Sequence, residues 1–179
     1  TALDEAGTQI IIEASEVISQ EPVACNNGTS IAVKNLFYNV PARRKFLHTD
    51  TSEYKNIVQE FTRVAMAYPS VSFRLFNNNT EQYYLPSTNL KSRIIELLGT
   101  RFEKHLIPIQ QDTDLLTIHG FIGKPDAATR TRGNQFFFIN NRFIRSSYLN
   151  HAIASTFESM IDKKAFPFYV VFFEMNPER

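Results

Sequence analysis

Apolar and polar residues alternate along several short stretches of the chain, which is the pattern of half-buried β-strands. Near the start of the chain the alternation predicts three successive strands, at Gly7–Glu13, Glu21–Cys25 and Ser30–Leu36. Asn26-Asn27-Gly28, between the last two, carries the Asn-Gly signal of a β-hairpin turn. We therefore expect this part of the chain to form an antiparallel sheet.

A helical period replaces the alternation after the third stretch. Asp50 and Glu53 have the spacing of a capping box, and apolar residues then recur at helical intervals from Tyr54 to Tyr68. Pro69 ends this pattern, because proline cannot continue a helix. A domain boundary is expected near Leu47–Asp50, with one domain at residues 1–48 and a second at residues 49–179.

The rest of the chain alternates between strand-like and helix-like patterns. The expected elements are strands Val71–Phe76 and Glu81–Leu85, a helix capped by Asn89, strands Leu106–Ile109, Leu115–Ile122 and Asn134–Ile139, a helix capped by Ser146 or Ser147, and strand Phe168–Met175. This order, ββαβββαβ, predicts an α+β fold with helices packed on one face of a β-sheet. The last strand is nearly all apolar, so we expect it to be central or covered on both faces.

Composition limits the possible classes of protein. The 179 residues are 43% hydrophobic and 13% aromatic, which is enough for a substantial core, and the net charge is only +1. Any contact with a nucleic acid must therefore come from a local basic patch. The single cysteine, Cys25, excludes an internal disulfide and a cysteine zinc site, and we expect it to be buried. The four histidines share no metal-ligand spacing, so no metal is expected.

The most informative segment is Gly28–Leu47, with the sequence GTSIAVKNLFYNVPARRKFL. Pro41 is suited to the first position of a short helix, which places Arg43, Arg44 and Lys45 in the first turns of that helix. The helix dipole disfavours cations there. Both an anionic partner and a solvated basic turn would account for them.

This segment closely resembles the signature of MutL-type DNA mismatch repair proteins, G-T-x-[apolar]-x-V-x-x-L-F-x-N-x-P-A-R-R-K-F. A second stretch, Phe137–Ile153, is similar to the family element F-V-N-x-R-x-[apolar]-R-x-x-x-[apolar]-x-x-A-[apolar]. The resemblance implies that residues 1–48 are the C-terminal strands of an incomplete GHKL ATPase α/β sandwich. Residues 49–179 would be a C-terminally truncated transducer domain, which resembles domain 2 of a ribosomal protein. We accordingly expect an excised fragment.

The resemblance also implies a partial nucleotide site. Gly28 and Thr29 match the family's last nucleotide-binding motif, although by themselves they are more typical of a hairpin glycine and a strand threonine than of a ligand site. The family's catalytic glutamate, Mg²⁺-binding asparagine and phosphate-binding lysine are not found. The parent protein is therefore expected to use ATP and Mg²⁺ as a weak ATPase, whereas this chain has no catalytic residue and should hold neither. Asn39 and the basic cluster, which consists of Arg43, Arg44 and Lys45, would belong to an inter-domain motif.

Four arginines are candidate DNA contacts. Arg130 and Arg132 lie in the polar segment Lys124–Arg132, and Arg142 and Arg145 match basic positions of the second family element. Ser147 stands where the family has a further DNA-binding cation, which weakens the comparison at that point. An exposed loop without a ligand is the alternative for Arg130 and Arg132.

The resemblance implies a mechanical role in mismatch repair. The chain would couple ATP binding in the upstream domain to dimer closure and DNA binding. The expected partners are DNA, a mismatch-recognition protein of the MutS type and a second copy of the full-length protein, in the bacterial cytoplasm and at the nucleoid during repair. No signal peptide or membrane segment is expected. The alternative is a nucleotide-independent DNA-binding or dimerisation module of another GHKL-family protein, such as a topoisomerase.

Overall fold

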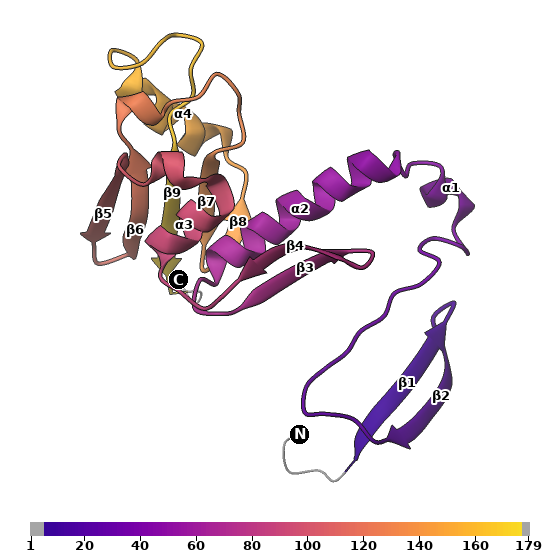
Figure 1. Ribbon diagram of the computed structural model, residues 1–179. Coiled ribbons are helices and arrows are strands. Elements are labelled where there is room, and N and C mark those ends of the chain that lie inside the picture. The colour runs from indigo at the N-terminus through magenta and orange to yellow at the C-terminus, as the bar shows by residue number, and fades with distance from the viewer. Residues whose placement is uncertain (1–5, 177–179) are drawn as a thin grey trace. The chain divides into compact units, whose positions relative to one another are not determined.

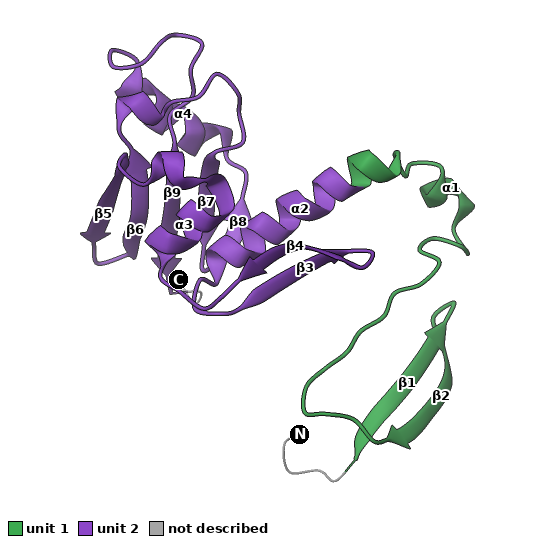
Figure 2. Cartoon of the chain, viewed as in Figure 1, with its two compact units in different colours: residues 1–53 green, residues 54–179 purple. Residues whose placement is uncertain are grey.

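The computed structural model describes residues 6–176, and the chain divides into two compact units, Thr1–Glu53 and Tyr54–Arg179 (Figure 2). One helix, α2 (Asp50–Ala67), begins in the first unit and continues into the second. The assignment of residues 1–48 and 49–179 to two domain families stays a prediction.

The first unit contains one β-hairpin, formed by β1 (Gly7–Glu13) and β2 (Glu16–Val23) (Figure 1). Its two turn residues, Ala14 and Ser15, have φ angles of 50° and 74°. Positive φ at both central residues is typical of a type I′ turn, whose twist matches that of the flanking strands. The prediction of a hairpin at Asn26-Asn27-Gly28 was wrong, because Ser30–Leu36 forms no strand that could pair with β2; the hairpin turn lies at Ala14 and Ser15.

The predicted third strand, Ser30–Leu36, is not formed. Its apolar side chains are exposed, with 83% of Ile31 and 75% of Val33 accessible to solvent. A strand needs a neighbour that satisfies its backbone groups, and this segment has no strand partner among the described residues. Cys25, which was expected to be buried, is also exposed.

The second unit contains four helical segments besides α2, and two sheets. Its elements after α2 are β3 (Phe73–Asn77), β4 (Thr80–Leu85), α3 (Leu90–Leu98), the 3₁₀ turn η1 (Thr100–Phe102), β5 (Leu106–Asp112), β6 (Leu116–Gly123), the 3₁₀ turn η2 (Pro125–Ala127), β7 (Gln135–Ile139), β8 (Arg142–Ile144), α4 (Ser147–Phe157) and β9 (Tyr169–Met175). The predicted order ββαβββαβ therefore lacked β8, a strand of only three residues.

The main sheet is mixed and has the strand order β5-β6-β9-β7-β8. Strands β7 and β9 are parallel, and the other neighbours are antiparallel. The apolar strand β9 lies at the centre, as its composition predicted, and its first four residues are buried. Strands β3 and β4 form a separate two-stranded sheet.

Helices cover both faces of the main sheet, so the prediction that they pack on one face was wrong (Figure 1). One face contacts Met66 and Ala67 of α2 and Ile94 of α3, through Phe138, Val170 and Phe172. The other face contacts Leu149 and Ile153 of α4, through Phe137, Tyr169 and Val171. Both sets of alternating residues in β7 and β9 are apolar, and each set requires its own cover.

The fully buried guanidinium of Arg93, on α3, joins three parts of the second unit. It donates hydrogen bonds to four backbone carbonyl oxygens, those of Ala65 (3.1 Å), Pro69 (3.0 Å), Val71 (3.1 Å) and Pro86 (2.6 Å). Three of these carbonyls lie at or just beyond the C-terminal end of α2, where helical carbonyls lack partners within the helix. Arg93 therefore fixes the end of α2 to α3 and to the β3–β4 hairpin.

The helix ends in the second unit follow the predicted caps. Asn89 accepts a hydrogen bond from the Ser92 N–H (2.9 Å), and Ser146 accepts one from the Leu149 N–H (3.2 Å). Gly99, with φ of 103°, ends α3. No helix among residues 6–176 is long and apolar enough to cross a membrane.

Candidate functional site

The motif Gly28–Leu47 lies in the exposed part of the first unit. Gly28, with φ of 137°, and Thr29 belong to a segment without helix or strand, and both are exposed. A glycine in this conformation allows another molecule to approach the backbone closely. The structure therefore leaves the two candidate nucleotide contacts accessible.

A compact turn connects this segment to the basic cluster. The Tyr38 N–H donates to the Asn35 carbonyl (3.0 Å), the Val40 N–H donates to the Phe37 carbonyl (3.1 Å), and Asn39 lies within this turn. Asn35 and Phe37 both have positive φ, at 49° and 63°. Such a conformation is uncommon for phenylalanine and is found where the surroundings hold it.

Helix α1 (Pro41–Arg44) follows and is a single turn. Arg43 and Arg44 lie in this turn and Lys45 caps its C-terminal end, so the helix is too short to have separate first turns in which its dipole would disfavour these cations. All three side chains are exposed, and no ion pair involves them among the described residues. This basic turn lies close in sequence to the start of α2.

In the second unit, Arg130 and Arg132 lie on the loop between η2 and β7, and both are exposed. The guanidinium of Arg132 lies 4.8 Å from the centre of the Phe166 ring. A cation above an aromatic face is attracted by the ring quadrupole. Phe166 therefore gives Arg132 a defined position on an otherwise polar loop.

Arg142 and Arg145 lie at the two ends of β8. The turn that precedes β8, Asn140-Asn141, has positive φ at both residues (46° and 63°), as expected for asparagine in a tight hairpin turn. Arg145 lies near a third arginine, Arg63 on α2, which packs over the Phe143 ring at 4.1 Å.

Arg63 is a buried cation that the sequence analysis did not identify. Only 7% of the residue is exposed, its guanidinium pairs with Glu60, and its Nε has no hydrogen-bond partner in the described part of the chain. Burial lowers the pKa of Arg63, Glu60 raises it, and the neighbouring charge of Arg145 lowers it further. Two arginines, Arg63 and Arg145, therefore lie near each other between α2 and β8, and Glu60 offsets one of their charges.

The four predicted DNA contacts do not converge on one site. Arg130 and Arg132 precede the start of β7, whereas Arg142 pairs with Ile139 at its end. Since a strand rises about 3.3 Å per residue, the length of β7 separates the two groups by roughly 15 Å. Arg145 lies between the two groups along the direction of β7, because it directly follows Ile144, which pairs with Phe137 in the middle of that strand.

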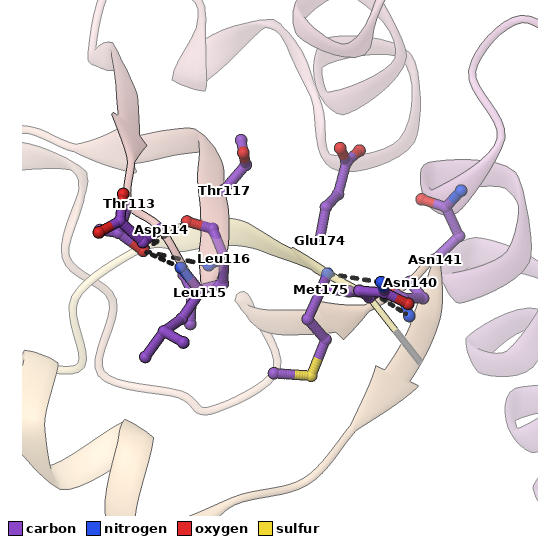
Figure 3. Close-up of a pocket in the computed structure, with 10 residues that line it drawn as sticks. Thr113, Asp114, Leu115, Leu116, Thr117, Asn140, Asn141, Glu174 and Met175 are labelled. Atoms are coloured by element: carbon purple, nitrogen blue, oxygen red, sulfur yellow. Dashed lines mark hydrogen bonds between the residues drawn. The ribbon is translucent and has the colours of Figure 1, made fainter. Parts of the chain in front are cut away.

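A polar hollow of about 530 Å³ lies at the end of the sheet where Arg142 is found (Figure 3). Its walls come from the β5–β6 turn, the β7–β8 turn and the end of β9, and they include Asp114, Asn141 and Glu174. The side chain of Asn140 bonds there to the backbone of Met175 (Figure 3). A second cavity, of about 330 Å³, is apolar and lies between α4 and the sheet.

Among residues 6–176, no group of three or more histidine, cysteine or carboxylate side chains lies close enough to hold a metal ion. The exposed cations of the loops, together with the Gly28–Thr29 segment, are the features suited to an anionic ligand.

Comparison with known proteins identifies the relatives of this chain. A family profile described as "DNA mismatch repair protein, C-terminal domain" matches residues 94–179. The DNA mismatch repair protein MutL of Christiangramia forsetii is 48% identical over 178 residues, which are 99% of this chain and 29% of the relative. MutL of Flavobacterium johnsoniae is 42% identical over 174 residues, which are 97% of this chain and 27% of the relative. The chain thus spans less than a third of these proteins.

The fold has a counterpart among solved structures. The Aquifex aeolicus MutL ATPase domain complexed with ADP superimposes with a TM-score of 0.69 at 24% sequence identity. The match covers 97% of this chain and 64% of the Aquifex aeolicus chain. At this level of identity the likeness concerns the fold.

Proposed function

Because this chain belongs to the MutL family of DNA mismatch repair proteins, we propose that it couples nucleotide binding elsewhere in its parent protein to dimer closure and DNA binding. Residues 1–48 would be the end of a GHKL ATPase domain, and residues 49–179 would be the transducer domain.

The continuity of α2 carries this proposal. The helix begins beside the basic turn of the first unit and continues, without glycine or proline, into the core of the second (Figure 2). Its start is held by Glu53, which accepts a hydrogen bond from the His48 N–H (2.9 Å), and its end is held by Arg93. A displacement at one end of an unbroken helix reaches the other end, because close-packed elements transmit strain.

The nucleotide would be bound mainly outside this chain. Gly28 and Thr29 would contact ATP in the parent protein, with Mg²⁺ held by residues that this chain lacks. The chain alone would therefore be catalytically inactive, and its parent would be a weak ATPase. The Aquifex aeolicus MutL ATPase domain is complexed with ADP, which supports a nucleotide site in the parent protein.

DNA would be contacted through backbone phosphates. Arg130, Arg132 and Arg145 are exposed and positively charged, and flexible basic side chains suit contacts that do not depend on sequence. Arg142 is the weaker candidate, because it pairs with Ile139 at the opposite end of β7 from the loop that carries Arg130 and Arg132.

The partners would follow from the family. The parent protein would form a homodimer, meet a mismatch-recognition protein of the MutS type and act in the bacterial cytoplasm at the nucleoid. The relatives described above are bacterial proteins with the same role in their names, which supports this context.

A nucleotide-independent DNA-binding or dimerisation module is the second candidate function, favoured by the exposed cations of the second unit. The two candidates differ in one experiment, a titration of duplex DNA at several salt concentrations with this chain and with the parent protein. Coupling predicts that ATP increases the DNA affinity of the parent and has no effect on this chain. Equal affinities, unchanged by ATP in both proteins, would instead support the independent module.

A further inference from the structure

Two loops that are distant in sequence are joined by a backbone bridge. The Thr129 N–H donates to the Phe166 carbonyl (3.0 Å), and the Phe166 N–H donates to the Thr129 carbonyl (2.8 Å). The bridge joins the segment 124–134 to the segment 162–168. Both segments lie at the end of the sheet where β7 and β9 begin, since Gln135 pairs with Tyr169 (Figure 1).

The bridge brings exposed cations from both loops together. Arg130 and Arg132 lie one and three residues beyond Thr129, and Lys163 and Lys164 lie shortly before Phe166. No ion pair involves these four side chains among the described residues. Counted with Lys124, the cations of the two segments exceed their carboxylates, Asp126 and Asp162, by three, whereas the whole chain has a net charge of +1.

The loops have a defined conformation. The Thr129 hydroxyl donates to the Thr131 carbonyl (2.8 Å), and the Gln135 side chain donates to the Pro167 carbonyl (2.9 Å). The Ala165 N–H donates to the Asp162 carbonyl (2.8 Å), which closes the turn that contains both lysines. Such bonds lower the entropy that is lost when a ligand binds.

We propose that Lys163 and Lys164 form, with Arg130 and Arg132, a single patch that binds the phosphates of the DNA backbone. This inference rests on the proposed function and assigns its DNA contact to the sheet end where β7 begins. The patch is suited to an extended polyanion, because its cations lie on exposed loops and line neither of the two cavities described above. Contact through phosphates alone is independent of base sequence.

The test is a titration of a fluorescent random-sequence DNA duplex with the chain over a series of salt concentrations. Each lost phosphate contact reduces the slope of log K against log salt by about 0.9, so Lys163→Gln/Lys164→Gln should reduce it by roughly 1.8. The affinity at about 0.1 M salt should fall on the order of tenfold or more.

A matched control removes the same charge elsewhere. Lys55 on α2 and Lys91 on α3 are exposed and lie outside the two loops, so Lys55→Gln/Lys91→Gln should leave the slope near its original value. Thermal melting of each variant, followed by circular dichroism, verifies that the fold is retained. A slope for the Lys163/Lys164 variant equal to that of this control would overturn the inference.

Two further outcomes distinguish a failure of the four-cation patch from a failure of the proposed DNA binding. If Arg130→Gln/Arg132→Gln reduces the slope and the lysine variant does not, the proposed function stands and the patch is wrong. If the unmodified chain fails to bind the duplex even at the lowest salt concentration, the DNA-binding part of the proposed function fails together with the patch.

Discussion

The side chain of Asn140 forms two hydrogen bonds with the backbone of Met175, one donated by its amide nitrogen and one accepted by its oxygen, each 3.0 Å long. The Asn140 N–H also donates to the Phe173 carbonyl (2.9 Å). Asn140 thereby continues the pairing between β7 and β9 beyond the last residue of β7, and it fixes the end of β9 to the β7–β8 turn.

Replacing Asn140 by glycine removes the two side-chain bonds and keeps the φ of 46° accessible. We expect the free energy of unfolding to fall by about 1 kcal/mol, the usual net contribution of such bonds. Denaturation by urea measures this change. Asn141→Gly is the control, since Asn141 has positive φ in the same turn; a loss as large in this variant would contradict the role assigned to Asn140.

Arg93→Met should destabilise the second unit strongly. The substitution keeps much of the side-chain volume but leaves the carbonyl oxygens of Ala65, Pro69 and Val71 without their donor. We expect a loss of about 3 kcal/mol or more, because unsatisfied buried polar groups are costly.

An exposed arginine provides the comparison for Arg93. Arg74 pairs with Glu81 at the surface of the β3–β4 hairpin, so Arg74→Met should cost less than about 1 kcal/mol. Equal losses in chemical denaturation of the two variants would show that the four carbonyl contacts of Arg93 contribute little.

Gly120→Ala should disrupt the contact between β6 and β9. Gly120 has φ of 138°, and a Cβ atom there would collide with the carbonyl oxygen of Val170, in the central strand. We expect a loss of about 2 kcal/mol or more, from backbone strain and displacement of β9 together.

Gly133→Ala is the control that introduces backbone strain without a steric collision. Gly133 has a similar φ of 129°, but no atom lies within 4 Å of a Cβ built there. Its substitution should cost about 1 kcal/mol from strain alone. Thermal melting measures the loss of stability in each variant. Equal losses would argue against a close approach of the β6 and β9 backbones at Gly120.

Alkaline pH should destabilise the second unit through Tyr169. Burial raises the pKa of Tyr169 to about 12, and its hydroxyl donates to the Asn150 side chain. The folded state therefore keeps a proton that the unfolded state releases above pH of about 10, so the free energy of unfolding should fall by about 1.4 kcal/mol per pH unit between about 10 and 12.

Tyr169→Phe removes this titration. The variant should be less stable than the original chain near neutral pH, because it lacks the bond to Asn150, but its stability should change less between pH of about 10 and 12. Urea denaturation over that pH range gives both quantities, and parallel pH dependences for the two proteins would exclude Tyr169 as the responsible group.

Local patterns predicted the elements of the second unit well. The caps at Asn89 and Ser146 and the central place of the strand Tyr169–Met175 are confirmed. Each depends on a residue and its close neighbours in sequence, such as a side chain that bonds to a backbone N–H three positions later. Candidate site residues were chosen mainly by family resemblance, and their roles stay predictions.

The failures have a common cause. The third strand of the first unit, at Ser30–Leu36, has the correct alternation but no neighbour to pair with, and alternation does not specify a partner. Likewise, no local pattern identified Arg63 or Arg93 as buried, because their burial depends on Phe143 and on carbonyl oxygens that the fold brings to them.

The sequence by itself therefore determined the family, most helix and strand positions, and the identity of the cations available for an anionic ligand. Only the tertiary structure decided that helices cover both sheet faces and that Arg142 lies apart from Arg130 and Arg132. It also decided that the loop with Lys163 and Lys164 is bridged to the loop with Arg130 and Arg132. The physical reason is that hydrogen-bond patterns within a few residues are encoded locally. Contacts between distant segments, such as the pair formed by Thr129 and Phe166, arise only when the sheet sets the register of its strands.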